Sequence, residues 1–143
     1  MPSIGANIST ASRAAMGSAL RLGADLITNG GFDADSDWTK GTGWTIGSGV
    51  ATATNVASAA ALVQGIAIAV ATTYRIRIEV SGYTGGVCQI WLGAVYSGVE
   101  INANGVWTTE VTTGDPLGSS TLSLQGYTNF TADLDNISVR AIL

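Results

Sequence analysis

The sequence predicts an all-β protein, an antiparallel β-sandwich of the jelly-roll type. Three observations point to this fold class. Apolar and polar residues alternate in about nine or ten short runs at roughly 8–12-residue spacing. The 19 glycines far outnumber the 2 prolines, which indicates many tight turns. Only 11% of the residues are charged while 46% are apolar, a balance typical of a folded chain rather than a disordered one.

The length and the charge limit the classes of function. A chain of 143 residues is one domain with enough core to fold without disulfide bonds or metal ions. The net charge of −4 and the six scattered Lys and Arg residues argue against nucleic acid and against an anionic membrane as partners. The single cysteine, Cys88, cannot form an internal disulfide bond and is expected in the core.

Residues 1–25 differ in composition from residues 26–143. They are small and polar, with an Ala-rich stretch whose two glycines make any helix weak. Such a segment buries too little apolar surface to fold alone. Two interpretations stay open: a docking arm that lies on its own sandwich or on a partner subunit, and a frayed terminus. No apolar run ahead of residue 26 is long enough for a signal peptide, so we expect synthesis in the cytoplasm.

The elements from residue 26 onward are short strands separated by turns. The run 26–28 ends at a glycine turn, and residues 43–46 and 50–54 form a hairpin. The alanine-rich run 59–70 has the composition of a helix, but Gly65 and a period of two through three later apolar residues favour a strand. Residues 74–81 show the clearest alternation in the chain and predict a half-buried antiparallel strand. The later strands are expected at residues 87–92, 96–101, 106–111, 121–125 and 133–141, with a loop at 126–130.

The last of these strands carries carboxylates in phase with its apolar residues. Side chains alternate between faces along a strand, so Asp133 and Asp135 share the parity of Ile137 and Val139. An inward carboxylate requires backbone N–H donors or a hard cation such as Ca²⁺. The alternative is a bulge before Ile137, which turns Asp135 outward into solvent.

Several short motifs resemble those of carbohydrate-binding modules and galactose-binding-like jelly rolls. The resemblance covers residues 26–142 and lies in the opening Asn29-Gly30-Gly31-Phe32-Asp33 and the closing Leu134-Asp135-Asn136-Ile137-Ser138-Val139. It implies that these two motifs lie together and bind a structural Ca²⁺ through Asp33 and Asp135, with backbone carbonyls near Asn29 to Phe32 as further ligands.

The chain also resembles small Gly/Ala/Thr-rich proteins that tailed phages carry on the virion surface. That resemblance implies a non-enzymatic virion structural protein, a capsid decoration (cement) or head/tail surface protein of a bacteriophage. It would be located in the virion, bind a major capsid protein or another virion protein through residues 1–25, and form a homo-oligomer. The alternative function is a glycan-binding module for attachment to a cell surface.

The inventory of reactive side chains predicts no enzyme and no catalytic residue. Without any His, neither Cys88 nor a serine has the usual activating base. The carboxylates could in principle hydrolyse glycosides as a pair. However, Glu79 shares a strand face with Arg75 and Arg77, an ion-pair environment that keeps a carboxylate ionised instead of making it a general acid.

The aromatic residues supply the candidates for binding. The four tryptophans serve as core anchors, sugar platforms or subunit contacts; the core is expected for Trp44 and Trp107, which begin strands. Trp38, in the loop that begins with the acidic stretch 33–37, is expected to be exposed. An exposed aromatic ring stacks on a pyranose while Asn or Gln side chains give specificity. The candidate glycan or partner contacts are Trp38, Tyr83, Tyr96 and Tyr127.

The calcium hypothesis yields a first prediction. An ion that binds only the folded state stabilises it, by roughly 2.7 kcal/mol at a hundredfold excess over Kd. Millimolar calcium should therefore raise the melting temperature by several degrees, and a chelator should reverse the shift. Asp135→Ala should abolish this calcium dependence. Differential scanning calorimetry in calcium and in chelator measures it, and equal melting temperatures for the wild type would refute the metal site.

Overall fold

A computed structural model describes residues 21–143 as an all-β domain; the proposed docking arm lies, up to residue 20, outside the described residues. Every strand pairing is antiparallel. The part of the chain that the structure describes contains no helix, and so none that could cross a membrane. The strands are β1 (Thr39–Lys40), β2 (Trp44–Gly47), β3 (Val50–Val56), β4 (Ala61–Gly65), β5 (Thr73–Leu92), β6 (Val95–Ile101), β7 (Gly105–Thr112) and β8 (Thr121–Ala141).

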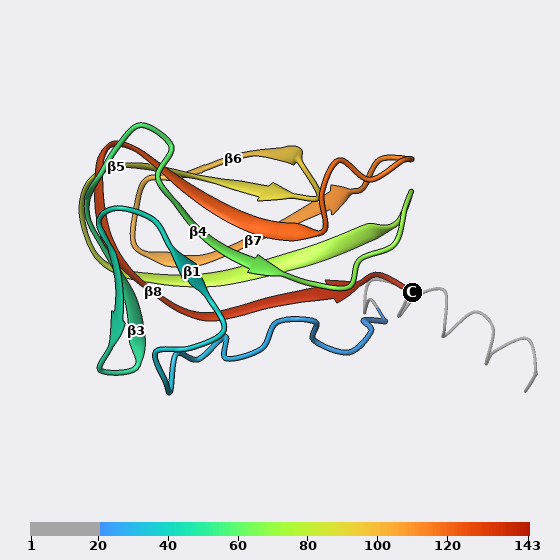
Figure 1. The fold of residues 1–143 in the computed structure, drawn as a ribbon, viewed down its shortest axis with the longest axis horizontal. Helices are drawn as coiled ribbons and strands as arrows, with labels where there is room; N and C mark the ends of the chain where they lie inside the picture. Colours follow the sequence, from blue (N-terminus) through green and yellow to red (C-terminus); the bar gives the residue numbers. More distant parts are fainter. Residues whose placement is uncertain (1–20) are drawn as a thin grey trace, which may run out of the picture.

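Two long strands, β5 and β8, run through both layers of a sandwich (Figure 1). The first half of β5 pairs with β7 and with the second half of β8, which also pairs with β3; β2 follows β3 at the edge. We call this order, β7–β5–β8–β3–β2, the first layer. The second half of β5 pairs with β6 and with the first half of β8, and β4 and β1 follow. This second layer has the order β6–β5–β8–β4–β1, and the predicted antiparallel β-sandwich is confirmed.

The core lies between the two layers and is filled by alternate residues of the long strands. Ile76, Ile78, Leu124 and Leu134 are all fully buried and belong to one apolar cluster. In the first half of β5 the even positions are buried and the odd positions half-buried, as the alternation predicts. Cys88 is fully buried in the second half of the same strand, as expected.

The short strands predicted from the sequence are in part halves of longer ones. Residues 74–81 and 87–92 both belong to β5, and residues 121–125 and 133–141 both belong to β8. The prediction of a loop at residues 126–130 was wrong, because β8 continues through this stretch as a bend. Thr128 and Asn129 take left-handed backbone angles there, with φ of 55° and 64°, and both are exposed. A bend of this kind uses the same residue types as a turn between two strands, so the local sequence does not distinguish the two.

A bulge near the end of β8 decides the orientation of Asp135. Leu134 and Ile137 are both buried although they are three residues apart, which a regular strand does not allow. Asn136 adopts a φ of 47°, and the register between β5 and β8 shifts at this point. The extra residue turns Asp135 away from the core, where its Oδ1 accepts the N–H of Asn136 at 2.8 Å. The inward orientation of Asp135 was therefore wrong, and the bulge interpretation holds.

The chain enters the domain beside its own end. Leu22 forms a β-bridge with Ile142, and the N–H of Gly23 donates to Ala141 O at 2.8 Å. The carboxylate of Asp25 then accepts the N–H of Val139 at 3.1 Å. Residues 21–25, the last part of the proposed arm, therefore lie along the end of β8.

The bend of β5 requires a glycine at position 86. Gly86 has a φ of 76°, and a Cβ built on it would lie 2.4 Å from the backbone N and Cα of Phe130 in β8. The two backbones approach each other closely at the bend, where both long strands pass from one layer to the other (Figure 1). We expect Gly86→Ala to destabilise the fold by about 2–4 kcal/mol. An alanine is strained at this left-handed backbone angle, and its Cβ would also overlap the backbone of Phe130.

Urea denaturation measures this loss, and Gly47→Ala is the matched control. Gly47 lies in β2, and a Cβ added there would have no other atom within 4 Å. Its substitution should therefore change stability by less than about 0.5 kcal/mol. Equal stabilities of the two variants would contradict the role of Gly86.

Candidate functional site

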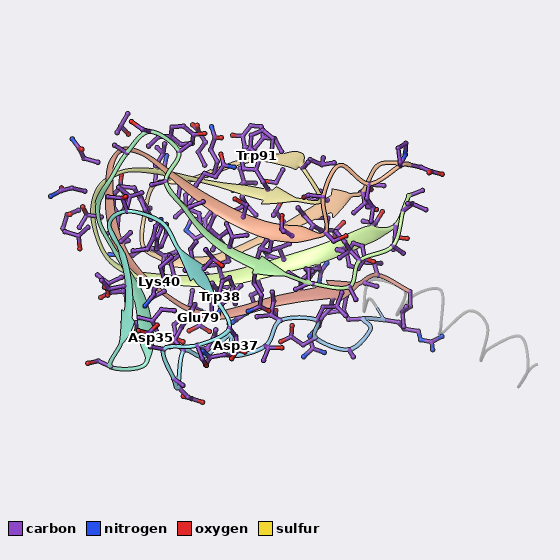
Figure 2. The ribbon with its side chains drawn as sticks, viewed as in Figure 1. Asp35, Asp37, Trp38, Lys40, Glu79 and Trp91 are labelled. Atoms are coloured by element: carbon purple, nitrogen blue, oxygen red, sulfur yellow. The ribbon has the colours of Figure 1, made fainter. Side chains whose placement is uncertain are left out.

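The structure corrects the assignment of Trp38. This side chain is buried, with 7% of its surface exposed, and its Nε1 donates to Asn29 O at 3.1 Å. Its ring lies 5.4 Å from that of Phe32, centroid to centroid. Trp38 therefore anchors the acidic loop to the core, and the prediction of an exposed contact was wrong. Figure 2 shows it among the loop residues, where Asp35 pairs with Lys40 at 2.6 Å.

Tyr83 is also a structural residue. Its ring is half-buried and packs on Phe130 at 6.3 Å between centroids, and its hydroxyl donates to Gly86 O at 2.7 Å. These contacts hold the bend of β5 against β8. The ring and the hydroxyl of Tyr83 are therefore both engaged in contacts within the domain. The two other predicted contacts, Tyr96 and Tyr127, lie elsewhere on the surface.

Tyr96 and Tyr127 lie on the outer side of the second layer together with Trp91. In β5, Trp91 alternates with the buried Ile90 and Leu92 and so faces outward. Tyr96 of β6 is its direct cross-strand partner. β8 brings Tyr127 opposite the outward side of β5. We call this surface the aromatic face; its residues are Gln89, Trp91, Tyr96, Glu100, Ser123, Gln125 and Tyr127.

The first half of the aromatic face is held by hydrogen bonds and stacking. The rings of Trp91 and Tyr96 stack at 5.1 Å between centroids with an interplanar angle of 28°. Trp91 Nε1 donates to Gln89 Oε1 at 3.1 Å, and Gln89 Nε2 donates to Glu100 Oε2 at 3.1 Å. Because its polar atom is satisfied, the indole is fixed in one orientation. Figure 2 places Trp91 over β5 and β6, away from Trp38.

The second half of the face is arranged in the same way by β8. Tyr127 donates its hydroxyl proton to Gln125 Oε1 at 2.9 Å, and Gln125 Nε2 lies 3.4 Å from Ser123 Oγ. Gln89 and Gln125 are direct cross-strand neighbours, so two carboxamides lie between the aromatic groups. The alternating pattern of their strands indicates that Gln89, Glu100 and Gln125 face outward. No sequence motif distinguishes these three from ordinary surface residues, so the sequence alone did not identify them as part of a site.

The aromatic face carries negative charge and no Lys or Arg among its residues. The pKa of Tyr96 is raised above its ordinary value by partial desolvation, by the Glu100 carboxylate and by Tyr127. Tyr96 is therefore a neutral phenol at physiological pH, with both donor and acceptor capacity. The face offers flat rings bordered by amide, hydroxyl and carboxylate groups.

Two of the glutamates, Glu79 and Glu110, form ion pairs with arginines. Arg77 Nη1 lies 2.7 Å from Glu79 Oε2, and Arg75 Nη2 lies 2.8 Å from Glu110 Oε2, as the sequence predicts for this strand face. The pKa of Glu79 is lowered by a hydrogen bond from Asn136 and by Arg77, so this group is a poor general acid. Burial raises the pKa of the Cys88 thiol, which makes it a poor nucleophile.

The two predicted calcium ligands lie at the surface. Asp33 is exposed, and its backbone N–H donates to Asn29 Oδ1 at 3.0 Å. Asp135 is turned outward by the bulge described above. Within residues 21–143, no three His, Cys, Asp or Glu side chains come together in a way that could hold a metal ion.

Two of the backbone carbonyls expected beside these carboxylates already accept protein hydrogen bonds. Asn29 O accepts the N–H of Phe32 at 3.2 Å as well as the indole N–H of Trp38, and Gly30 O accepts the N–H of Ile137 at 3.0 Å. The donor set therefore fits poorly with an ion that prefers roughly six to eight oxygens. The opening and closing motifs do lie together, as the resemblance implied, and calcium binding stays a prediction.

No protein-family model and no curated protein matches the sequence. The fold is similar to solved structures of two carbohydrate-binding modules. A family 4 module (CBM4) aligns with a TM-score of 0.56 and 14% identity, over 80% of this chain and 99% of that one. A family 16 module aligns with a TM-score of 0.50 and 21% identity, over 80% and 98% of the two chains.

A third similar structure is the enzymatically active domain of tailspike protein 4 of bacteriophage CBA120. Its TM-score is 0.53 with 15% identity, and the match covers 82% of this chain but 21% of that one. At such identities the likeness concerns the fold alone. The all-β, carbohydrate-binding-module-like architecture expected from the sequence is therefore confirmed.

The ionisation of Glu79 gives a prediction about acid stability. Because its pKa in the folded state is lowered, its stabilising contribution is present above the ordinary value of 4.5 and is lost as the pH falls through the lowered value. Asn136→Ala removes the largest cause of the shift and should move the pKa of Glu79 upward. Carbon-detected NMR titration of the carboxyl group measures this pKa; an unchanged value in the variant would contradict the assigned cause.

Proposed function

We propose that this domain is a glycan-binding module without catalytic activity of its own, and that it binds sugar on the aromatic face. The observation that carries the proposal is the grouping of Trp91, Tyr96 and Tyr127 on one outward sheet surface with two carboxamides between them. Glycan binding, which the sequence predicts as the alternative function, thus becomes the leading proposal.

The chemistry of the face suits a carbohydrate. A pyranose ring presents apolar C–H groups that stack on an aromatic ring, and its hydroxyls pair with amide and carboxylate groups. Gln89 and Gln125 offer both donors and acceptors, and Glu100 offers an acceptor. Aromatic side chains with two χ angles lose little conformational entropy on binding, so a fixed platform of this kind favours affinity.

The fold of the similar structures supports the same proposal. Two of them are carbohydrate-binding modules whose whole chains match this domain. The ion pairs of Glu79 and Glu110 and the burial of the Cys88 thiol also make these three groups poor candidates for a catalytic role.

The second candidate function is a surface protein of a phage virion, in which the module attaches the particle to host sugars. The similarity to a domain of a phage tailspike protein favours it, although the match covers 21% of that chain. The capsid partner, the docking role of residues 1–25 and the homo-oligomer belong to this candidate. Mass spectrometry of purified virions separates it from a module of a cellular protein.

Removal of the indole platform provides the central test. We expect Trp91→Ala to weaken binding to a polysaccharide at least tenfold, equivalent to about 1.4 kcal/mol, because the ring that stacks on the sugar is lost. Affinity electrophoresis against a panel of soluble plant, fungal and bacterial polysaccharides identifies the ligand, and isothermal titration calorimetry measures the change.

Trp107→Ala is the matched control. Trp107 lies in β7 of the first layer and its Nε1 donates to Ala103 O at 3.1 Å, so its loss should leave sugar binding unchanged. A glycan array and polysaccharide panel without any binding at millimolar sugar would refute the proposal, as would equal affinity of the Trp91 variant and the wild type.

A further inference from the structure

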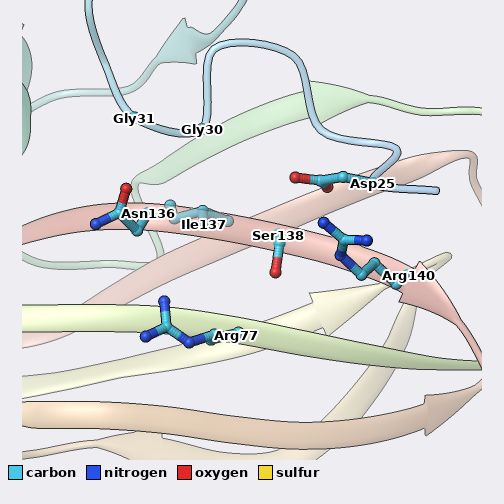
Figure 3. A pocket seen from close by; sticks show the side chains of 8 residues that line it. All are labelled: Asp25, Gly30, Gly31, Arg77, Asn136, Ile137, Ser138 and Arg140. Carbon is cyan, nitrogen blue, oxygen red and sulfur yellow. The ribbon is translucent and has the colours of Figure 1, made fainter. Parts of the chain in front are cut away.

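A polar cleft of about 380 Å³ lies on the outer side of the first layer, in the other layer from the aromatic face (Figure 3). Four residues of β8 form its floor: Asn136, Ile137, Ser138 and Arg140. Arg77 of β5 borders one side, and the loop with Gly30 and Gly31 borders the other. None of the residues that line it is aromatic. A ligand in this cleft would therefore be held by hydrogen bonds and charge rather than by stacking.

Arginine side chains gather on the sheet face that contains this cleft, and two of them, Arg77 and Arg140, line it. The whole sequence has six Lys and Arg residues, and three of them, Arg75, Arg77 and Arg140, lie on two adjacent strands. Arg75 and Arg140 are direct cross-strand partners, an arrangement of like charges that destabilises a sheet.

Arg140 is the arginine of this group without a carboxylate partner. Arg75 pairs with Glu110 and Arg77 with Glu79, as described above. Among the residues that the structure describes, no carboxylate lies within 4.0 Å of the Arg140 guanidinium, whose Nη1 donates to Gly23 O at 3.3 Å. Most of its N–H donors are therefore available to a ligand in the cleft.

The remaining groups of the cleft suit hydroxyls. Ser138 is the direct cross-strand neighbour of Arg77 and points its side chain into the space between the two arginines (Figure 3). Asp25 fixes its Oδ1 by accepting the N–H groups of Ile27 and Val139, at 3.0 and 3.1 Å. Its other carboxylate oxygen can accept a hydroxyl proton, while its charge disfavours ligands with two or more negative charges.

We propose that this cleft binds a singly charged organic carboxylate that carries neighbouring hydroxyl groups. Arg140, supported by Arg77, holds the carboxylate through the paired N–H groups of a guanidinium. Ser138 and Asp25 pair with the hydroxyls. A uronic acid unit of a glycan and a free hydroxy acid share this chemistry, and the site is separate from the aromatic face.

NMR titration of the full-length ¹⁵N-labelled protein tests the proposal with sodium glucuronate, sodium lactate, glucose and sodium sulfate at constant ionic strength. We expect glucuronate to shift the amide signals of Gly30, Gly31 and Ser138 with a Kd of about 1–10 mM. Glucose and sulfate should shift them at least tenfold less. Lactate binding as tight as that of glucuronate assigns the site to free hydroxy acids, and weaker binding assigns it to uronic acids.

Variants locate the binding. Arg140→Gln should weaken glucuronate binding at least tenfold, and Arg140→Lys, which keeps the charge but loses the paired donors, should fall between it and the wild type. Arg75→Gln is the matched control, since Arg75 lies on the same face outside the cleft. If Arg140→Gln does not fold, Arg77→Gln replaces it.

Three outcomes would overturn the proposal: equal shifts with glucose and glucuronate, no shift with either carboxylate at about 50 mM, or equal losses in the Arg75 and Arg140 variants. Trp91→Ala should leave these shifts unchanged. The two sites can therefore fail independently, because that variant tests the aromatic face alone.

Discussion

The structure depends on the antiparallel pairing of β5 with β8. This pairing runs from Tyr74 opposite Ala141 to Leu92 opposite Leu122, and the two strands bend together from one layer into the other. Every other strand except β1 and β2 attaches directly to one of these two. The bend is allowed by the close approach of the two backbones at Gly86 and by the left-handed angles of Thr128 and Asn129. Because both layers share the same two strands, their relative position is fixed by backbone hydrogen bonds as well as by side-chain packing.

The alternation of residues predicted most of this architecture, because a period of two is a local property. The stretch 74–81 is half-buried with its even positions inside, as its pattern indicated. What local patterns could not predict was continuity. A bend within a strand, as at Thr128 and Asn129, and a loop that ends a strand use similar residues. Which of the two forms depends on whether the partner strand continues alongside. The bulge at Asn136 is of the same kind, since one residue in the left-handed region reverses the phase of Asp133 and Asp135 relative to Ile137.

The candidate sites were harder to predict than the fold, for a related reason. Whether an aromatic side chain is exposed for binding or buried in the core depends on which other segments pack against it. Trp38 follows an acidic stretch and looked exposed, yet it covers Phe32. Trp91 gave no local signal, and its partner Tyr96 becomes its neighbour only through the pairing of β5 with β6. The cleft at Arg140 combines three distant segments, around residues 25–31, 77 and 136–140, and no spacing in the sequence connects them.

The path of residues 21–26 along the end of β8 has a mechanical consequence. Leu22 faces Ile142, Gly23 bonds to Ala141 and Leu26 bonds to Val139, so the two segments run in opposite directions with their outer ends side by side. A load applied between residue 21 and residue 143 would open this pairing one hydrogen bond at a time, as a zipper opens, instead of shearing all of them at once. Under such a load the segment 21–26 would peel away from the end of β8 residue by residue.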